Sequence, residues 1–324
     1  MDYPFNIISR EFDGGLLDNS ILASRPFVKL SRSFQDDARR FIADDQLETA
    51  INAAIAIGEP LLITGESGTG KTQAAYYAAY KLNIEPVIHF QVKSDSVAKD
   101  LLYNFDTIRY FHDSYLYRFG AQATECDFKL KEKKMYVEKR ALWHAFETAV
   151  NIGTPRVLLI DEIDKAPRDF PNDLLHELDK MEFHVTETDQ TISVPPKLRP
   201  IVFITSNSER RLPEPFLRRC VYHHIRFNDK ILDMAIKARR DDYAELSNEF
   251  LRMALQRFLS LRDRPLRKKP ATSELLLWLN VLAFSLDTSP EKLDEDLSEL
   301  PYLGVLLKDH QDIGDLTISG SLQD

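Results

Sequence analysis

Residues 65–72, with the sequence GESGTGKT, have the spacing of residue types that binds the phosphates of a nucleotide. The glycines let successive backbone N–H groups converge on phosphate oxygens, and the helix expected after them adds its positive dipole end. Lys71 can then reach the β and γ phosphates, and the Thr72 hydroxyl can coordinate Mg²⁺. The predicted nucleotide-binding residues are Gly65, Glu66, Ser67, Gly68, Thr69, Gly70, Lys71 and Thr72, with Asp161 beside them.

A second segment, residues 158–162 with the sequence LLIDE, supplies two carboxylates. They end an apolar run, so we expect both at the carboxyl edge of a sheet, where open α/β sheets bind ligands. Asp161 is expected on the Mg²⁺ side, with Thr72. Glu162 is expected to polarise the attacking water, because phosphoryl transfer needs a positioned nucleophile. An acidic pair at a strand end is usually only solvated, but the phosphate-binding loop favours the catalytic interpretation.

Short apolar runs predict the strands that must position these motifs. They are residues 60–63, 86–90, 157–160, 201–205 and 223–227. Because helical segments separate them, we expect buried parallel strands in a three-layer α/β domain. An alanine-rich helix over residues 72–82 should follow the loop, and a helix over residues 44–57 should precede the first strand, with Asp44 or Asp45 as its cap.

The change in periodicity along the chain predicts its domains. After residue 227 apolar side chains recur at helical spacing, which predicts a smaller C-terminal helical lid domain. The predicted parts are an N-terminal arm (1–40), the α/β nucleotide-binding domain (41–228), the lid (229–310) and an acidic tail (311–324). The α/β domain has insertions near 100–140 and 182–195. Lysine-rich residues 129–140 are interpreted as an exposed helix face, and the second insertion as a hairpin.

The composition favours a folded cytoplasmic protein over other classes. Hydrophobic residues make up 44% and charged residues 29% of the 324 residues. There is no long uncharged apolar run and no secretory signal pattern, which predicts no membrane association. Only Cys126 and Cys220 are present, without metal-site spacing, and both are interpreted as reduced thiols. The net charge of -9 argues against a broad binding surface for duplex DNA.

Three further segments carry a resemblance to a known family. Residues 161–167 (DEIDKAP), 201–207 and 212–220 (LPEPFLRRC) resemble the AAA+ superfamily, MoxR branch, and the resemblance spans residues 44–310. It implies ATP as the nucleotide, which the residues alone do not separate from GTP. It also implies that Asn207 orients the attacking water, and that Arg218 or Arg219 is an arginine finger acting on the nucleotide of a neighbouring subunit. The resemblance leaves open which arginine has this role.

The function implied is Mg²⁺-dependent ATP hydrolysis by a homo-oligomeric ring, expected to be a hexamer, that remodels or activates a protein partner. MoxR-like proteins often act beside proteins with a von Willebrand factor A domain, which makes such a partner an expectation here. Both insertions would then face the central opening of the ring. The alternatives are a nucleic-acid motor or loader, with phosphate contacts from residues 129–140 and Arg210–Arg211, and an inactive nucleotide-binding scaffold.

Two positions depart from the family pattern. The lid helix often begins with an arginine that contacts the γ phosphate, but the matching position holds Glu274. Thr272 or Ser273, together with Glu274, is expected to cap that helix instead, while residues 267–269 (RKK) are a weak substitute for the arginine. Residues 91–96 (QVKSDS) lack the aromatic residue that polypeptide-threading members carry there, so substrate handling is expected elsewhere.

Overall fold

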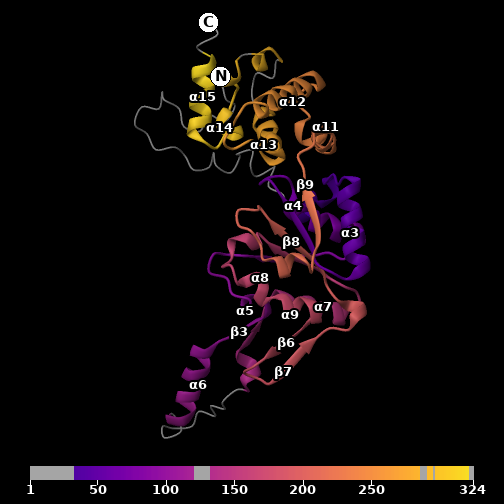
Figure 1. The fold of residues 1–324 in the computed structure, drawn as a ribbon, viewed down its shortest axis with the longest axis vertical. Helices are drawn as coiled ribbons and strands as arrows, with labels where there is room; N and C mark the ends of the chain where they lie inside the picture. The colour runs from indigo at the N-terminus through magenta and orange to yellow at the C-terminus, as the bar shows by residue number, and fades with distance from the viewer. Residues whose placement is uncertain (1–32, 120–131, 285–289, 295, 321–324) are drawn as a thin grey trace. The chain divides into compact units, whose positions relative to one another are not determined.

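The computed structural model describes residues 33–119, 132–284, 290–294 and 296–320. The chain divides into two compact units (Figure 1). The α/β unit consists of Asp44–Gly65 and Lys71–Ile225, and the helical unit consists of Met1–Ala43, Glu66–Gly70 and Arg226–Asp324. This division differs from the one predicted above, because the described residues before Asp44, the loop Glu66–Gly70 and the described residues after 310 all group with the helical unit.

A five-stranded parallel sheet forms the centre of the α/β unit. Its strands lie in the order β2-β5-β8-β1-β9. Their bounds are Leu61–Gly65 for β1, Ile88–Gln91 for β2, Val157–Asp161 for β5, Ile201–Ser206 for β8 and Val221–Ile225 for β9. With helices flanking this sheet, the predicted three-layer α/β fold is confirmed. The last strand lies two residues earlier than predicted, because its pairing with β1 begins at Leu61 opposite Val221.

Three helices of the α/β unit pack against this sheet: α3 (Asp45–Ile57), α4 (Lys71–Leu82) and α7 (Ala141–Ile152). The Asp44 carboxylate caps α3 by accepting a hydrogen bond from the backbone N–H of Leu47 at 2.7 Å, so the predicted cap is Asp44 rather than Asp45. Alanines make up much of the buried face of α4, which lets that helix approach the strands closely. This packing fixes the position of the first turn of α4 relative to the sheet.

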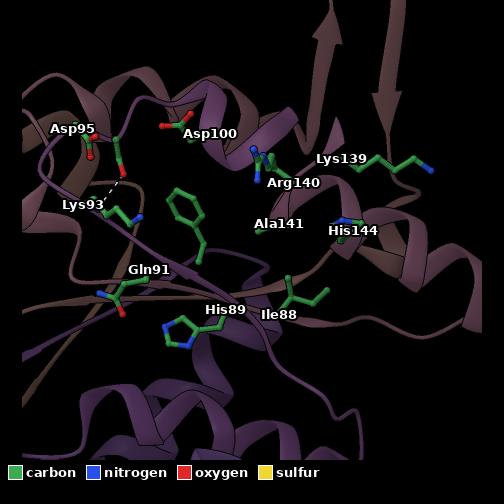
Figure 2. A pocket seen from close by; sticks show the side chains of 12 residues that line it. Ile88, His89, Gln91, Lys93, Asp95, Asp100, Lys139, Arg140, Ala141 and His144 are labelled. Carbon is green, nitrogen blue, oxygen red and sulfur yellow. Dashed lines mark hydrogen bonds between the residues drawn. The ribbon is translucent and has the colours of Figure 1, made fainter. Parts of the chain in front are cut away.

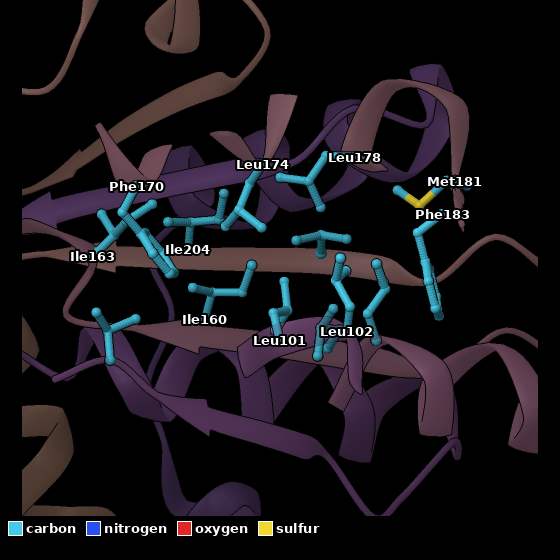
Figure 3. Packing of buried hydrophobic residues seen from close by; sticks show 14 of the residues in the cluster. Leu101, Leu102, Ile160, Ile163, Phe170, Leu174, Leu178, Met181, Phe183 and Ile204 are labelled. Carbon is cyan, nitrogen blue, oxygen red and sulfur yellow. The ribbon is translucent and has the colours of Figure 1, made fainter. Parts of the chain in front are cut away.

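The hydrophobic core of this unit lies between the strands and the segments that follow β5. Ile160 of β5 and Ile204 of β8 are fully buried, and they face Phe170 and Leu174 (Figure 3). Three short elements follow β5: η5 (Ile163–Lys165), α8 (Phe170–Asp173) and α9 (Leu175–Lys180). Phe170 begins α8, and Leu174 lies between α8 and α9. Their packing holds the chain that leaves the Asp161-Glu162 pair.

The first insertion lies between β2 and α7. It comprises α5 (Lys99–Leu102), β3 (Tyr103–Phe105), α6 (Thr107–Phe119), η4 (Lys133–Tyr136) and β4 (Val137–Lys139). The predicted helix face over residues 129–140 is wrong where the structure describes it, from residue 132. Those residues form a 3-10 turn and a strand instead, because Val137–Lys139 pairs antiparallel with β3 and Tyr136 is buried against Phe105.

The second insertion is an antiparallel hairpin of β6 (Glu182–Val185) and β7 (Gln190–Ser193). Aromatic rings join it to the first insertion. The Phe183 ring stacks on the Tyr103 ring at a centroid distance of 6.3 Å, and the Trp143 ring contacts both edge-on. Glu187 of the turn also pairs with Lys99 at 2.9 Å. We call the three rings the aromatic clamp; it holds the two insertions together.

The helical unit has its own core. It contains α2 (Phe34–Asp37), η2 (Ala38–Arg40), α11 (Asp229–Ala238), η7 (Arg240–Tyr243), α12 (Asn248–Arg262), α13 (Thr272–Leu282), η8 (Pro290–Leu293), η9 (Leu297–Glu299), α14 (Leu303–Leu306) and α15 (His310–Gly320). Fully buried Trp278 packs at the centre, and its indole N–H donates to the carbonyl of Pro301 at 2.6 Å. Within the residues that the structure describes, no helix of either unit could span a bilayer.

The predicted acidic tail is helical over most of its length. Residues 311–320 belong to α15, and residues 321–324 lie outside the described part. Asp312 is buried and accepts hydrogen bonds from the backbone N–H groups of Arg267 and Lys268, while Leu316 packs in the core. Although the segment is acidic, the Asp312 carboxylate is satisfied by backbone N–H groups of the loop before α13. Of the predicted arm, Arg40 pairs with Asp242 at 2.7 Å.

The aromatic clamp gives a stability prediction. Phe183→Ala should lower the free energy of unfolding by about 3–5 kcal/mol, because it removes a ring that is only 3% exposed. The matched control is Phe111→Ala, whose ring is 65% exposed and whose loss should change stability by about 0.5 kcal/mol or less. Urea unfolding followed by tryptophan fluorescence measures both. Equal stability losses in the two variants would contradict the clamp.

Candidate functional site

The phosphate-binding loop leaves β1 at Gly65 and enters α4 at Lys71. Gly68 and Gly70 have φ angles of 80° and 93°, a region that residues with a Cβ rarely adopt. A Cβ on Gly70 would lie 2.8 Å from the Phe41 ring, so this position has neither the backbone freedom nor the space for a side chain. The loop therefore presents backbone rather than side chains at its two glycines. This is what a close approach to phosphate oxygens needs.

Lys71 begins α4 and is buried, with 6% of its surface exposed. Its ammonium group donates a hydrogen bond to the carbonyl of Gly65 at 3.0 Å. Burial lowers the pKa of Lys71, and the nearby carboxylates of Asp164 and Asp161 oppose that effect. The lysine thus lies at the end of β1, next to the acidic end of β5, as the motif predicts.

Asp161 ends β5 and accepts hydrogen bonds from three elements. The Thr72 hydroxyl lies 3.0 Å from its Oδ1 atom, and the Thr205 hydroxyl of β8 lies 2.5 Å from the same atom. On the other side, His89 Nε2 of β2 lies 3.2 Å from Oδ2. Burial raises the pKa of Asp161, but these hydrogen bonds outweigh it and hold the pKa below the ordinary value of 3.8. The carboxylate is therefore kept ionised.

The pair of Thr72 and Asp161 fits a Mg²⁺ ion. A hydroxyl and an ionised carboxylate are hard oxygen ligands, and here they are already in contact. Mg²⁺ in phosphoryl-transfer sites is commonly held by one or two such side chains together with phosphate oxygens and water. The donor set that the structure brings together is thus the one that the sequence predicted for this ion.

Glu162 follows Asp161 in a left-handed backbone conformation, with a φ of 61°. Its N–H donates to the Thr205 hydroxyl at 2.8 Å, which fixes the turn after β5. Its carboxylate accepts hydrogen bonds from Asn207 at 3.3 Å, from Gln91 at 2.7 Å and from Lys165 at 2.5 Å. The structure thus brings Asn207 and Glu162 together, as expected for two groups that share a water-positioning role.

Four residues near this pair were missed by the sequence analysis. Thr205, His89 and Gln91 contact the two carboxylates directly. Asp164 accepts the N–H groups of Asn207 and Glu209 and so holds the chain after β8. Thr205 could have been identified from the sequence, because it ends the strand predicted over residues 201–205. For β2 the missing information was the strand order, which places Gln91 opposite Asp161.

Arg218 and Arg219 follow α10 (Glu214–Leu217), and their ion-pair partners in the described part of the chain are neither Asp161 nor Glu162. Their environments differ. The Arg218 side chain is 77% exposed and pairs with exposed Glu214 at 2.6 Å. Arg219 is 45% exposed and pairs with Asp179 of α9 at 2.8 Å. Arg218 is thus the more accessible arginine, and Arg219 has a partner within its own unit.

Within the helical unit, the loop Glu66–Gly70 contacts α12 and α13. Arg262 is buried, lies 3.5 Å from the centroid of the Phe227 ring and pairs with Glu66 at 3.2 Å. Backbone N–H of Ser273 donates to the carbonyl of Gly68 at 3.1 Å. Arg262 was not considered from the sequence, because it ends a helix and its partner is far away along the chain.

The predicted cap of α13 needs a correction. The helix begins at Thr272, so the N-cap position belongs to Ala271 rather than to Thr272 or Ser273. Glu274 instead satisfies this terminus, since its carboxylate accepts the N–H of Ala271 at 3.0 Å. Glu274 thus helps to cap α13, as expected, but it does so by bonding the backbone of Ala271.

Comparisons with known proteins identify the domain that carries this site. Residues 60–220 match the profile of the AAA domain, dynein-related subfamily, so the chain contains an AAA domain. No curated protein matches the chain. Among solved structures, NtrX from Brucella abortus aligns with 16% identity over 91% of this chain and 59% of that chain, with a TM-score of 0.47.

Two other solved structures show a similar level of likeness. NtrX from Brucella abortus in complex with ADP aligns with 14% identity over 94% of this chain and 66% of that chain, with a TM-score of 0.49. A candidate ATPase from Cytophaga hutchinsonii aligns with 14% identity over 92% of this chain and 95% of that chain, with a TM-score of 0.38. This chain thus spans less than two thirds of the length of both NtrX chains.

The shared role of Thr205 gives a prediction. Thr205→Val removes a donor to Asp161 and the acceptor of the Glu162 N–H, so the free energy of unfolding should fall by about 1–3 kcal/mol. Because the folded pKa of Asp161 is depressed, the loss should be full above pH 3.8 and should shrink as the pH falls through the folded-state pKa.

Chemical denaturation at several pH values measures this dependence. Thr191→Val is the matched control, because Thr191 is exposed on the hairpin and bonds neither carboxylate. A loss in Thr205→Val that stayed constant down to strongly acidic pH would contradict the assigned hydrogen bonds.

Proposed function

From the AAA domain and the bonded side chains within it, we propose that this chain is a Mg²⁺-dependent ATPase. The observation that carries the proposal is the Asp161 carboxylate, which bonds Thr72 at the start of α4 and, through the Thr205 hydroxyl, the backbone of Glu162. In this proposal, the residues assigned to metal binding and those assigned to water activation lie on one edge of the sheet. That edge is where parallel α/β sheets bind their ligands.

Each residue of the candidate site has a defined task in this proposal. The loop N–H groups and Lys71 hold the phosphates, and Thr72 and Asp161 hold the metal ion. Bound Mg²⁺ would neutralise charge that develops on the phosphate oxygens. Glu162 accepts a hydrogen bond from the attacking water and, with Asn207, fixes its direction. ATP is proposed over GTP because of the AAA domain alone.

Two substitutions separate binding from hydrolysis. Lys71→Ala should weaken nucleotide binding by at least about thirtyfold, because it removes a buried cation from the phosphate site. Glu162→Gln should keep nucleotide binding but lower turnover by about 10²–10⁴-fold, because the amide is a poor acceptor for a water proton. Fluorescent-nucleotide binding and phosphate release measure the two effects.

The control for these variants is Glu245→Gln, which changes an exposed carboxylate of the helical unit. Unchanged turnover in Glu162→Gln would rule out the proposed water activation. Tight binding without turnover in the unsubstituted chain would instead favour the inactive scaffold.

We further propose that the chain acts as a homo-oligomer in which Arg218 reaches the nucleotide of a neighbouring subunit. What supports this choice is the exposure of Arg218 and the partner of Arg219 in its own unit. An exposed ion pair such as the one between Arg218 and Glu214 contributes little free energy, so Arg218 can leave it readily. A hexameric ring remains the proposed assembly.

The two arginines can be tested separately. Arg218→Ala should lower turnover by about 10³-fold or more while sparing nucleotide binding, as for loss of an arginine finger. Arg219→Ala should lower turnover by no more than about threefold, since it loses only a half-exposed ion pair. Steady-state ATPase assays at a protein concentration that supports assembly measure both. The reverse ranking would assign the finger to Arg219.

The proposed task of the ring is to remodel or activate a protein partner, as in the MoxR branch, with a von Willebrand factor A domain protein as a candidate partner. Supporting features are the segments 161–167 and 212–220 and the hairpin before β8, which sits where MoxR-like proteins carry an insertion. A nucleic-acid motor is less favoured because the net charge is -9. Affinity capture with the Glu162→Gln chain and ATP, with Lys71→Ala as the control, would show whether a protein or a nucleic acid is retained.

A further inference from the structure

Strand β2 is an open edge of the central sheet. It pairs with β5 on one side and has no strand on the other in the described part of the chain. An unpaired edge presents backbone N–H and C=O groups that can bond another strand. A partner can use such an edge only where no other part of the protein covers it.

A pocket of about 530 Å³ lies along β2 (Figure 2). All residues of the strand, Ile88 to Gln91, line it. Successive side chains of a strand point to opposite faces, so a pocket that touches every residue of β2 runs along its edge rather than over one face. The remaining lining comes from the loop after β2, from Asp100 of α5, from Lys139 of β4 and from the start of α7. The edge is therefore open to a ligand.

The two ends of the pocket carry different charges. Near Ile88 lie His144 and Arg140, with Lys139 beyond them, whereas Asp95 and Lys93 lie toward the Gln91 end and Asp100 lies between Asp95 and Arg140 (Figure 2). Arg140 pairs with exposed Glu138, and Lys139 pairs with half-buried Glu147. Solvent-accessible pairs of this kind contribute little free energy, so both cations can bind another carboxylate. The Ile88 end can therefore accept an acidic side chain.

The strand is also held rigidly in place. The imidazole of His89 contacts Tyr76 through Nδ1 at 3.1 Å and Asp161 through Nε2 at 3.2 Å. The Gln91 side chain donates to Glu162 at 2.7 Å. Because these side chains anchor β2 to its neighbours, the strand is already ordered before a partner binds. Binding therefore costs less conformational entropy.

From these observations we propose that β2 binds an extended segment of a partner polypeptide, which adds a strand to the sheet edge and places acidic side chains at the Ile88 end. Backbone hydrogen bonds would supply affinity, and the separated charges would select sequence and direction. The pocket size suits a few residues of such a segment. This inference rests on the proposed action on a protein partner and names a surface for it.

A defined peptide tests the inference. The probe is a fluorescein-labelled octapeptide with two glutamates at one end, alternating valine and threonine, and a lysine at the other end, made in both chain directions. Binding to the full chain is measured by fluorescence anisotropy without nucleotide. One direction should bind at least about tenfold more tightly than the other, because only one matches the charges. N-methylation of alternate peptide nitrogens, in each of the two possible registers, should weaken binding at least about tenfold in one register, since it removes donors to the edge.

Protein variants test the charged end. The double variant Lys139→Glu with Arg140→Glu should weaken peptide binding at least about tenfold, while Lys197→Glu, an exposed lysine outside the pocket, should leave it unchanged. Should the double variant fail to fold, the N-methylated peptides with the unsubstituted chain still decide the question. Equal binding of all methylated peptides, no binding of either direction up to about 1 mM, or displacement by a single-stranded oligonucleotide would overturn the inference.

ATP turnover of the same preparation keeps this test separate from the proposed function. A chain that hydrolyses ATP but does not bind the peptide overturns the edge-strand inference alone. A chain that binds the peptide but lacks turnover overturns the ATPase proposal and supports the binding surface.

Discussion

The charge on the Asp161 carboxylate is the constraint on which the candidate site depends. Burial opposes this charge, and donors from three different elements maintain it: Thr72 of α4, Thr205 of β8 and His89 of β2. Two of those elements are the strands on either side of β5, so the strand order itself delivers the donors. A shift of register in either neighbouring strand would remove a donor and leave a buried charge poorly satisfied. The charge on Asp161 therefore depends on the order and register of the strands.

Glu162 shows how the same network directs the next residue. Its left-handed backbone conformation costs about 1 kcal/mol or more, and the bond from its N–H to Thr205 helps to offset that cost. The turn sends the Glu162 side chain away from the strand direction, where it meets Asn207 and Gln91. The Thr205 hydroxyl therefore bonds both the Asp161 carboxylate and the backbone of Glu162. The two carboxylates have different partners, which suits them to different tasks.

Local sequence patterns predicted the sheet and the motifs better than they predicted the contacts between them. The loop after β1 and the acidic end of β5 were readable because each depends on residues adjacent in the chain. His89 and Gln91 were not, because their role follows from β2 lying beside β5, and strand order is not encoded locally. Likewise, Tyr136 lies in a buried turn because it packs against Phe105 within the first insertion, and this packing overrides the helical pattern of its charged neighbours. The catalytic roles themselves stay predictions.

The aromatic clamp has a mechanical consequence. Moving the hairpin relative to β3 must separate the Phe183 ring from Tyr103 and Trp143, and each such ring contact is worth about 0.5–1.5 kcal/mol beyond its buried area. The clamp also includes a ring on α7, the helix that leads into β5. A load applied to the hairpin is therefore shared with the first insertion and carried to α7. The two insertions are thus connected through Trp143 to α7, the helix that precedes the strand ending at Asp161.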